Sequence, residues 1–299
     1  MFIRLMSTRS SGRHSQITMA RRDVDADPVV PADAQSVEPP TINDMGVPDR
    51  CLSLTVRADW GHFRRVDRTV TKQTYRLPPR TTIAGMLAAM VGSSRDSYYE
   101  MFAPEVSAIA IEPLGTIRTI TEPMLGLSTN PDEHFENAGG TGQKTVKASY
   151  PDSTSNRQLH SYELLVDPAY RIDVAVEDEE FYRALAHRLK TGTTHYPLSM
   201  GLSEYLAWIE FHGERTVEVC DDEVVKVDSA VPGGVESVVP HEGVRTHVER
   251  MPSFMEADER GRRTTGFDDY TFTTDDSAIS VRSGSVVPSQ ISDRSVIFG

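Results

Sequence analysis

The residues in this sequence with the clearest capacity for chemistry form a run of cations between residues 57 and 80. They are Arg57, Arg64, Arg65, Arg68, Lys72, Arg76 and Arg80. Within the same window only Asp59 and Asp67 oppose them, although the 299-residue chain carries a formal net charge of −13 at pH 7. Guanidinium groups bind anions, and phosphates above all, through paired charge-assisted hydrogen bonds. The window therefore predicts a site for an anionic ligand.

Flat rings are interspersed with these cations. They are Trp60, His62, Phe63 and Tyr75. Aromatic rings stack on unpaired nucleobases while arginines hold the phosphates, so this mixture is suited to a single nucleic-acid strand. For any one arginine, a basic surface loop balanced by acids elsewhere is the simpler interpretation. For the whole cluster, in a chain this acidic, we favour the anion site.

The cations lead into the segment "RTTIAGMLAAMVG", which predicts a helix. An apolar stripe recurs at helical spacing and consists of Ile83, Met86, Leu87 and Met90. We expect Thr81 or Thr82 to cap the start of the helix and Gly92 to end it. The open N–H groups and the positive dipole end at the mouth of this helix, beside Arg80, favour an anion.

Other candidate motifs do not meet their chemical requirements. "GGTGQKT" at 139–145 lacks the glycine directly before lysine that a phosphate-binding loop needs, and it lacks the flanking strand and helix. In "HEGVRTH" the histidines are six residues apart, so they would not share a helical face as zinc ligands. No GxSxG motif occurs. We predict neither a metal nor a cofactor.

The overall composition is acidic and poor in lysine. Asp and Glu total 44 against 31 Lys and Arg, and only five of the cations are lysines. A one-sign surface charge opposes aggregation, so we favour a protein from a very salty cytoplasm over an ordinary acidic protein rich in arginine codons. At molar salt the screening length falls to about 3 Å, so binding would rest on direct arginine contacts and stacking.

Cysteine usage and hydropathy point to a cytoplasmic protein. Cys51 and Cys220 are the only cysteines and form no CxxC pair, which favours a reducing compartment. No run approaches the roughly eighteen apolar residues of a membrane span, so we expect no membrane contact.

Residues 1–48 differ from the rest of the chain. Arginines come first, followed by a stretch rich in Asp, Pro, Ala and Val, with few aromatics and no periodicity. This composition predicts a disordered extension. Met45 lies just before the first expected strand and is an alternative start of the protein; a functional basic arm is the less favoured interpretation.

Residues 49–213 show the periodicity of a folded domain. In order, the pattern predicts a half-buried strand at 52–56, the helix at 81–92, one or two strands within 106–120, a strand at 170–177, a helix at 178–192 and a strand at 207–213. A polar stretch at about 122–160 is long enough for a protruding hairpin or loop. The order βαββαβ predicts an α+β, ferredoxin-like domain of the kind found in RNA-recognition modules. Residues 214–299 predict a smaller β-rich region of valine-rich strands.

Three segments together resemble a known family. They are "WGHFRR…TKQTYRLPPRTTIAGMLAAMVG", "DSYYEMF" and "YPLSMGLSEYLAWI". In this order and spacing they resemble the CRISPR-associated (Cas) family five subunit of type I-B Cascade, an RNA-guided surveillance complex. The similarity covers roughly Cys51 to Phe211 and extends weakly to "VERMPSFM"; residues 1–48 lie outside it.

The resemblance implies a subunit of the RAMP superfamily that holds the 5′ handle of the CRISPR RNA (crRNA). It implies contacts with the Cas family seven backbone subunit, with the family eight large subunit and, through the complex, with the family six ribonuclease. Residues 122–160 would form a thumb hairpin with Lys144 and Lys147 near its tip. Gly201 would lie in a loop where backbone closely approaches backbone or RNA. Arg64, Arg65, Lys72, Arg80 and the helix mouth at Thr81 and Thr82 would face RNA.

Three classes of function compete. We favour a non-catalytic RNA clamp in antiviral defence. The alternative is a metal-independent endoribonuclease, as in the I-C branch of the family. His62, Lys72 and Tyr75 together have the chemistry for the base, the acid and the cation that such cleavage needs, but their spacing does not demand it. A plain protein-interaction module would leave the arginine window unexplained.

Overall fold

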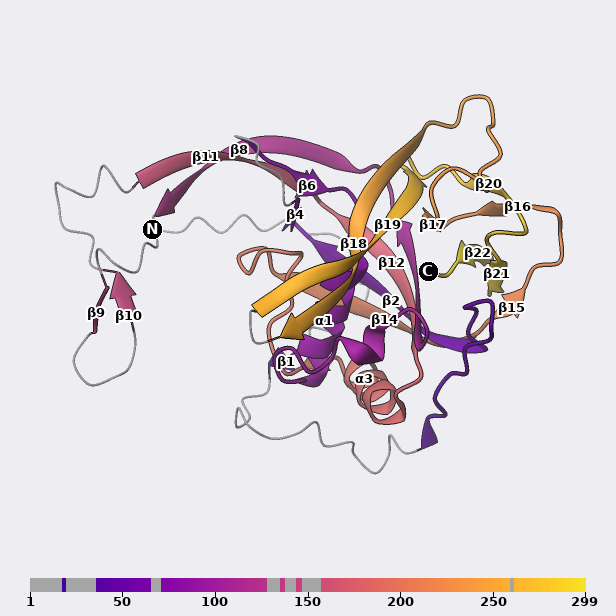
Figure 1. Ribbon diagram of the computed structural model, residues 1–299, viewed down its shortest axis with the longest axis horizontal. Helices are drawn as coiled ribbons and strands as arrows, with labels where there is room; N and C mark the ends of the chain where they lie inside the picture. Colours follow the sequence, from indigo (N-terminus) through magenta and orange to yellow (C-terminus); the bar gives the residue numbers. More distant parts are fainter. Residues whose placement is uncertain are drawn as a thin grey trace, which may run out of the picture.

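The computed structural model of the protein describes residues 36–65, 71–127, 157–258 and 261–299, together with the backbone of short strands at 18–19, 135–137 and 144–146. Its centre is a four-stranded antiparallel sheet in the order β14-β2-β12-β7. The four strands are β2 (Arg50–Ala58), β7 (Ser107–Pro113), β12 (Ala169–Val176) and β14 (Ala207–Thr216). Helix α1 (Arg80–Val91) lies between β2 and β7 in the chain, and α3 (Glu179–Thr191) lies between β12 and β14. The predicted strand–helix–strand–strand–helix–strand order is therefore present in an α+β chain (Figure 1).

One face of this sheet packs against the two helices. Leu52, Leu54 and Val56 of β2 share a hydrophobic core with Leu87 of α1 and Leu185 of α3. Both helices end as the sequence predicts, at Gly92 and Gly192, which adopt the left-handed conformation that glycine tolerates best.

The opposite face of the sheet is also buried, which corrects the prediction of a half-buried strand. Ser53 and Thr55, which alternate with the leucines of β2, are each 1% exposed. Small side chains dominate this face and allow the C-terminal strands to pack closely on it. The resulting second core contains Cys51, Ala108, Ala110 and Ala175 of the sheet, and Val217, Ile291, Val296 and Phe298 of the C-terminal region.

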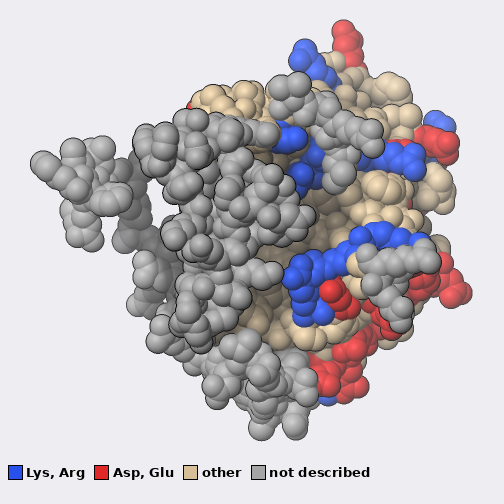
Figure 2. Space-filling model, turned by 60° about the vertical axis from the view of Figure 1, so that its left-hand side comes forward, with Lys and Arg blue, Asp and Glu red and all other residues tan. Residues whose placement is uncertain are grey.

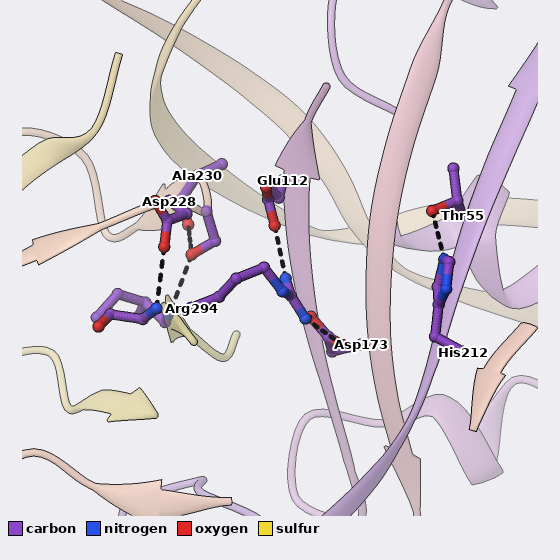
Figure 3. A network of polar contacts seen from close by, with 10 residues as sticks. Thr55, Glu112, Asp173, His212, Asp228, Ala230 and Arg294 are labelled. Atoms are coloured by element: carbon purple, nitrogen blue, oxygen red, sulfur yellow. Dashed lines mark hydrogen bonds and ion pairs between the residues drawn. The ribbon is translucent and has the colours of Figure 1, made fainter. Parts of the chain in front are cut away.

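An ion-pair network joins the C-terminal region to the covered face (Figure 3). The guanidinium of Arg294 donates to Asp173 on β12 with two 2.9 Å contacts and to Glu112 on β7 at 2.5 Å. The side chain of Asp173 is 1% exposed, so its charge depends on this partner. Nearby, Thr55 Oγ1 and His212 Nε2 are 2.8 Å apart.

The described residues of the C-terminal region form strands that are joined by turns and loops. They are β15 (Glu218–Val219), β16 (Val224–Val227), β17 (Val231–Pro232), β18 (Thr246–Asp258), β19 (Gly261–Thr273), β20 (Ile279–Arg282), β21 (Pro288–Ile291) and β22 (Arg294–Ile297). They form sheets β15-β21-β22, β16-β20 and β17-β19-β18. The long β18–β19 hairpin packs beside α1, and Met251 and Phe272 belong to the helix-side core.

A second hairpin reaches away from the body of the molecule (Figure 1). Strands β8 (Arg118–Leu127) and β11 (Arg157–Val166) pair in antiparallel register along their whole length. Farther out, β9 (Phe135–Asn137) pairs with β10 (Lys144–Val146). A protruding hairpin was predicted at about 122–160, and its paired strands begin and end several residues outside those limits.

The arginine window folds as short strands beside β11. They are β3 (Trp60–Gly61), β4 (Phe63–Arg64), β5 (Thr71–Lys72) and β6 (Thr74–Tyr75). Strands β3 and β5 both pair with β11, while β4 and β6 pair with each other. The smaller elements are β1 (Thr18–Met19), which pairs with β13 (Thr193–Thr194), and a 3₁₀ turn at Glu100–Phe102.

Residues 36–48, which the sequence predicted to be disordered, are placed against the domain. Val37 packs on the helix-side core, and its carbonyl oxygen accepts a 2.8 Å hydrogen bond from Arg183 of α3. The remainder of the predicted extension lies outside the described residues, apart from the two residues of β1.

Candidate functional site

A cleft of about 390 Å³ opens between α1, β4 and the loop that precedes β14. Its walls are formed by His62, Phe63, Arg64, Thr81, Thr82, Gly85, Met86, Ala89, Pro197, Leu198, Ser199, Gly201 and Leu202. Six of these were predicted site residues: His62, Phe63, Arg64, Thr81, Thr82 and Gly201. The fold thus brings together parts of the arginine window, the helix mouth and the glycine loop, which are far apart in sequence.

Helix α1 supplies one wall through a single face. Thr81, Gly85 and Ala89 follow one another at i, i+4 and i+8, so they line the same side of the helix. Small side chains along this row leave room for the cleft. The opposite side of α1 carries Ile83 and Leu87, which are both buried in the core.

The start of α1 differs from the prediction. Pro79, not Thr81 or Thr82, occupies the N-cap position, and no side chain caps the helix. The Pro79 carbonyl oxygen accepts bonds from the N–H groups of Thr82 at 2.8 Å and Ile83 at 3.0 Å. Since proline has no side-chain acceptor, the remaining N–H groups of the first turn are left to water or to a ligand. The threonines line the cleft instead.

Arg64 stands at the edge of the cleft because its neighbours are anchored. The preceding Phe63 is 2% exposed, and its N–H donates to Thr74 Oγ1 at 2.8 Å. The following Arg65 donates its N–H to the Gln73 carbonyl oxygen at 3.0 Å. Arg64 itself is exposed, so its charge faces solvent at the cleft wall.

Gly201 allows the third wall to approach the arginine window. Its φ of +92° lies in the left-handed region, and a Cβ built there would overlap the carbonyl oxygen of His62. The His62 N–H in turn donates to the Met200 carbonyl oxygen at 3.0 Å. The predicted close approach at Gly201 is therefore an approach of backbone to backbone, and only glycine fits it.

His62 is a neutral, buried member of the cleft wall. Its side chain is fully buried, and burial lowers the pKa of the ring, partly offset by a 2.8 Å hydrogen bond between Nδ1 and the Glu163 carbonyl oxygen. A carbonyl only accepts, so Nδ1 carries the proton and Nε2 is an acceptor. Within the described part of the chain, Nε2 is buried and has no hydrogen-bond partner.

Arg80 does not face a ligand, and the prediction for this residue is wrong. It is 1% exposed, and its guanidinium donates to Ser107 Oγ at 2.6 Å, to the Ser107 carbonyl oxygen at 2.8 Å and to the carbonyl oxygen of Gly299. Arg80 thus ties the start of α1 to β7 and to the end of the C-terminal strands. It is a structural residue of the core.

Two further predicted cations are engaged by protein groups. The Arg65 guanidinium lies 5.5 Å from the centre of the Tyr75 ring, which is 7% exposed. Arg76 pairs with Glu249 of β18 at 2.7 Å. These contacts brace the β4–β6 hairpin and join it to the C-terminal region.

The remaining predicted residues lie away from the cleft wall or outside the description. Arg57 is exposed opposite Trp208 on β14, Trp60 is 39% exposed, and Lys72 is half-buried beside β11. Lys144 lies in β10, but its side chain is outside the described residues, as are Arg68 and Lys147.

Several cleft residues did not appear among the sequence predictions. Met86 was predicted only as part of the apolar stripe, although Gly85 and Ala89 follow Thr81 by four and eight residues and so indicate a second face of the helix. Pro197, Leu198, Ser199 and Leu202 belong to the segment "YPLSMGLSEYLAWI", in which only Gly201 was singled out. Their position beside Gly201, which the sequence marks as a turn, was the signal that could have identified them.

Charged side chains are unevenly distributed on one face of the molecule. On the face drawn in Figure 2, lysine and arginine side chains lie on both sides of a hollow in the described surface, while acidic side chains gather along another edge. A local excess of positive charge can therefore attract an anion to a chain of net charge −13.

Metal binding and membrane insertion find no support in the described residues. Among them, no group of three or more His, Cys, Asp or Glu side chains is arranged to hold a metal ion. Within the same residues, neither helix has the length and apolar character required to cross a bilayer.

The family described as "CRISPR-associated protein (Cas_Cas5)" matches residues 51–270. The chain belongs to this family. The match covers the central sheet, both helices, the protruding hairpin and most of the β18–β19 hairpin. No curated protein sequence matches the chain.

Three of the solved structures that match the chain do so at low sequence identity. A CRISPR protein from Archaeoglobus fulgidus is 14% identical, with a TM-score of 0.48 over 83% of this chain and 98% of that one. A chain of a "CRISPR RNA-guided surveillance complex" is 12% identical, with a TM-score of 0.43 over 78% and 91%. A chain of a type III-B Cmr-beta complex bound to target RNA is 11% identical, with a TM-score of 0.39 over 76% and 86%. At these levels of similarity, the family membership rests on the sequence match.

Proposed function

We propose that this member of the Cas_Cas5 family is a non-catalytic RNA-binding subunit of a CRISPR surveillance complex, and that it holds the 5′ handle of the crRNA in the cleft. The observation that carries the proposal is the convergence of Arg64, the first turn of α1 and the Gly201 loop on one cavity. A phosphate would meet a guanidinium and helix N–H groups there, which are the two donors that bind it best.

The proposed domain fold, complex type and partner subunits are those expected for the same family. We propose a ferredoxin-like central domain, because the strand order β14-β2-β12-β7 with a helix after the first and third strands in sequence is the topology expected for it. We further propose a type I-B Cascade in a salt-rich cytoplasm, with the family seven and family eight proteins as neighbours and the family six ribonuclease in the same complex. The protruding β8–β11 hairpin is a suitable thumb for such contacts.

The proposal of a clamp over a nuclease is supported by the positions of the three candidate catalytic residues. His62 alone lines the cleft, and its Nε2 is buried. The Tyr75 ring is buried beneath Arg65, and Lys72 lies in β5 away from the cleft wall. Incubation of the purified protein with repeat RNA in EDTA should give no product. A specific cut that His62→Ala abolishes would instead establish the endoribonuclease.

The test of RNA binding is a pull-down of the tagged protein with its complex at native salt, followed by sequencing of the bound RNA. We expect crRNA of uniform 5′ end, and we expect Arg64→Glu to lower the yield about tenfold. Arg282→Glu is the matched control, because Arg282 is exposed on β20, far in sequence from the cleft residues, and the charge change is the same. Equal RNA yield from the two variants, or no RNA with the unchanged protein, would contradict the proposal.

A further inference from the structure

The C-terminal strands cover only part of the second face of the central sheet. On this face of β2, Ser53 and Thr55 are each 1% exposed, whereas Arg57, the next residue along the same face, is exposed. Trp208 of β14 lies directly opposite Arg57 and is 46% exposed. The buried face therefore ends, at the start of β14, in a surface that the described residues leave open.

A second large apolar side chain extends this surface along β14. Leu206 lies in the extended segment that leads into β14, two residues before Trp208, so its side chain points to the same side, and it is 58% exposed. Ala207 and Ile209, the residues on either side of Trp208, point the other way and pack on the helix-side core. Contiguous apolar side chains that stay exposed on a folded chain typically mark an interaction site.

Two guanidinium groups on this face lack hydrogen-bond partners among the described residues. Arg57 forms no ion pair or hydrogen bond with any of them. The Nε of Arg171 on β12 is buried and has no acceptor within the same residues. Asp173 and Glu112, which attract Arg171, are already hydrogen-bonded to Arg294. A carboxylate supplied by another molecule would therefore complement the positive charge of this face.

Acidic side chains along β14 distinguish between two classes of partner. Glu204, Glu210 and Glu214 are all exposed on this strand or directly before it. The phosphates of a polynucleotide would meet these three carboxylates and be repelled by them. A protein segment, in contrast, can place one carboxylate at Arg57 and an apolar side chain on Trp208. Tryptophan and arginine are also the side chains that contribute most to the affinity of protein interfaces. The surface therefore favours a protein partner.

We infer that the sheet-end surface, formed by Arg57, Arg171, Leu206 and Trp208, docks a segment of a neighbouring protein subunit. An apolar side chain of that segment packs on Trp208 and Leu206, and an Asp or Glu side chain pairs with Arg57. The inference rests on the proposed function in one respect, since it takes the protein to be a subunit of a larger complex. It is separate from RNA binding, because the walls of the cleft include none of these four residues.

Site-specific cross-linking identifies the occupant. The photoreactive residue p-benzoylphenylalanine replaces Trp208 in the tagged protein, and the assembled complex is illuminated at native salt and analysed by mass spectrometry. We expect a single linked peptide, from another protein subunit, that contains a large apolar residue and an Asp or Glu. The matched control is the same replacement at Phe267, which is 47% exposed on β19 and should not link to that peptide.

Substitutions then test the two contacts. Trp208→Ala and Arg57→Glu should each lower the amount of the linked subunit that co-purifies with the protein about tenfold, because tryptophan and arginine anchors dominate interface affinity. Phe267→Ala should change this amount by less than about twofold, since it lies outside the docking surface. Arg57→Glu combined with replacement of the acid in the linked segment by Arg should restore most of the yield, because the two charges are again opposite.

Four results would overturn the inference. They are a cross-link to RNA, a cross-link to a second copy of this chain, no link specific to the Trp208 position, and an unchanged yield of the linked subunit from both substitutions. Circular dichroism checks folding, and where Trp208→Ala does not fold, the charge reversal at exposed Arg57 decides. The proposed function is tested separately, because Trp208→Ala should keep the RNA affinity of the unchanged protein whereas Arg64→Glu should lower it. A failure of docking leaves the Arg64→Glu result intact, and the reverse also holds.

Discussion

The cleft and the C-terminal side of the sheet both depend on arginine, yet they use it in opposite ways. Arg64 is exposed at the cleft wall, between anchored neighbours. Arg294 lies on the covered face of the sheet, where Asp173 and Glu112 take up its donors. Arg80 belongs with Arg294, because carbonyl and hydroxyl oxygens of the core accept hydrogen bonds from the two terminal nitrogens of its guanidinium.

The difference teaches that charge density in a sequence does not reveal the direction of a side chain. Arg80 lies in the densest cationic window and is buried, whereas Arg294 lies outside any cationic cluster and forms ion pairs with two largely buried carboxylates. What separates ligand-facing from structural arginines is the set of acceptors that the fold places around them. Variants of the cleft should therefore lose RNA binding, whereas variants of the Arg294 network should lose stability.

The largest effect should come from Arg294→Met. It leaves the carboxylate of Asp173 buried and without its cation, which typically costs about 3–5 kcal/mol. The unfolding free energy from urea titration should fall by that amount, while Arg282→Met, at an exposed position of β20, should change it by less than about 0.5 kcal/mol. A loss below about 1 kcal/mol would mean that the network does not hold the C-terminal strands.

A smaller loss of stability should follow Arg80→Met. Three carbonyl oxygens and the Ser107 hydroxyl lose a charged donor, and such bonds contribute about 1.5–3 kcal/mol. The fraction that remains folded should bind RNA with the affinity of the unchanged protein, because Arg80 does not reach the cleft. Weaker RNA binding without a loss of unfolding free energy would mean that Arg80 contacts the ligand and is not a structural residue.

Arg64→Ala should have the opposite effect, with weaker RNA binding and nearly unchanged stability. Its side chain is exposed, so the unfolding free energy should change by less than about 0.5 kcal/mol. RNA affinity should fall, and the dependence of log affinity on log salt should become shallower by about one phosphate contact. Urea titration and anisotropy at several salt concentrations give both values; a stability loss larger than the binding loss would contradict the assignment.

The smallest effect should come from the two buried histidines, one in each region, through the pH dependence of the unfolding free energy. Burial lowers the pKa of His62 in the cleft wall and of His212 near the Arg294 network, relative to an unfolded value of about 6.5. Below that value the unfolded state binds more protons than the folded state, so the unfolding free energy should fall as pH drops from 7.5 to 5.5. His62→Gln and His212→Gln should each make this slope shallower, and an unchanged slope in both would refute the burial of the two rings.

Much of the fold was predictable, because periodic apolar residues and glycine stops mark α1, α3 and the four central strands. The second covering of the sheet was not predictable, because its contact residues are alanine, serine and cysteine, whose small size gives no periodic signal. Residues 36–48 were missed for a similar reason: single side chains such as Val37 hold them in place, without a repeating pattern.

The candidate site was predictable in its parts. The types of residue at 62–64, 81–82 and 201 indicated anion chemistry, and all of them line the cleft. The apolar half was not foreseen, because it forms only when the 197–202 loop folds across α1. The burial of Arg80 and Tyr75 was not foreseen either, since it depends on partners from β7, β11 and the C-terminal region.

The central claim is that one RNA strand enters the cleft between α1 and the Gly201 loop. A cryo-EM map of the assembled complex tests it most directly. We predict a phosphate within hydrogen-bond distance of Arg64 and the first-turn N–H groups of α1. A map in which protein fills this cleft, or in which all RNA density lies on another face of the subunit, would contradict the account.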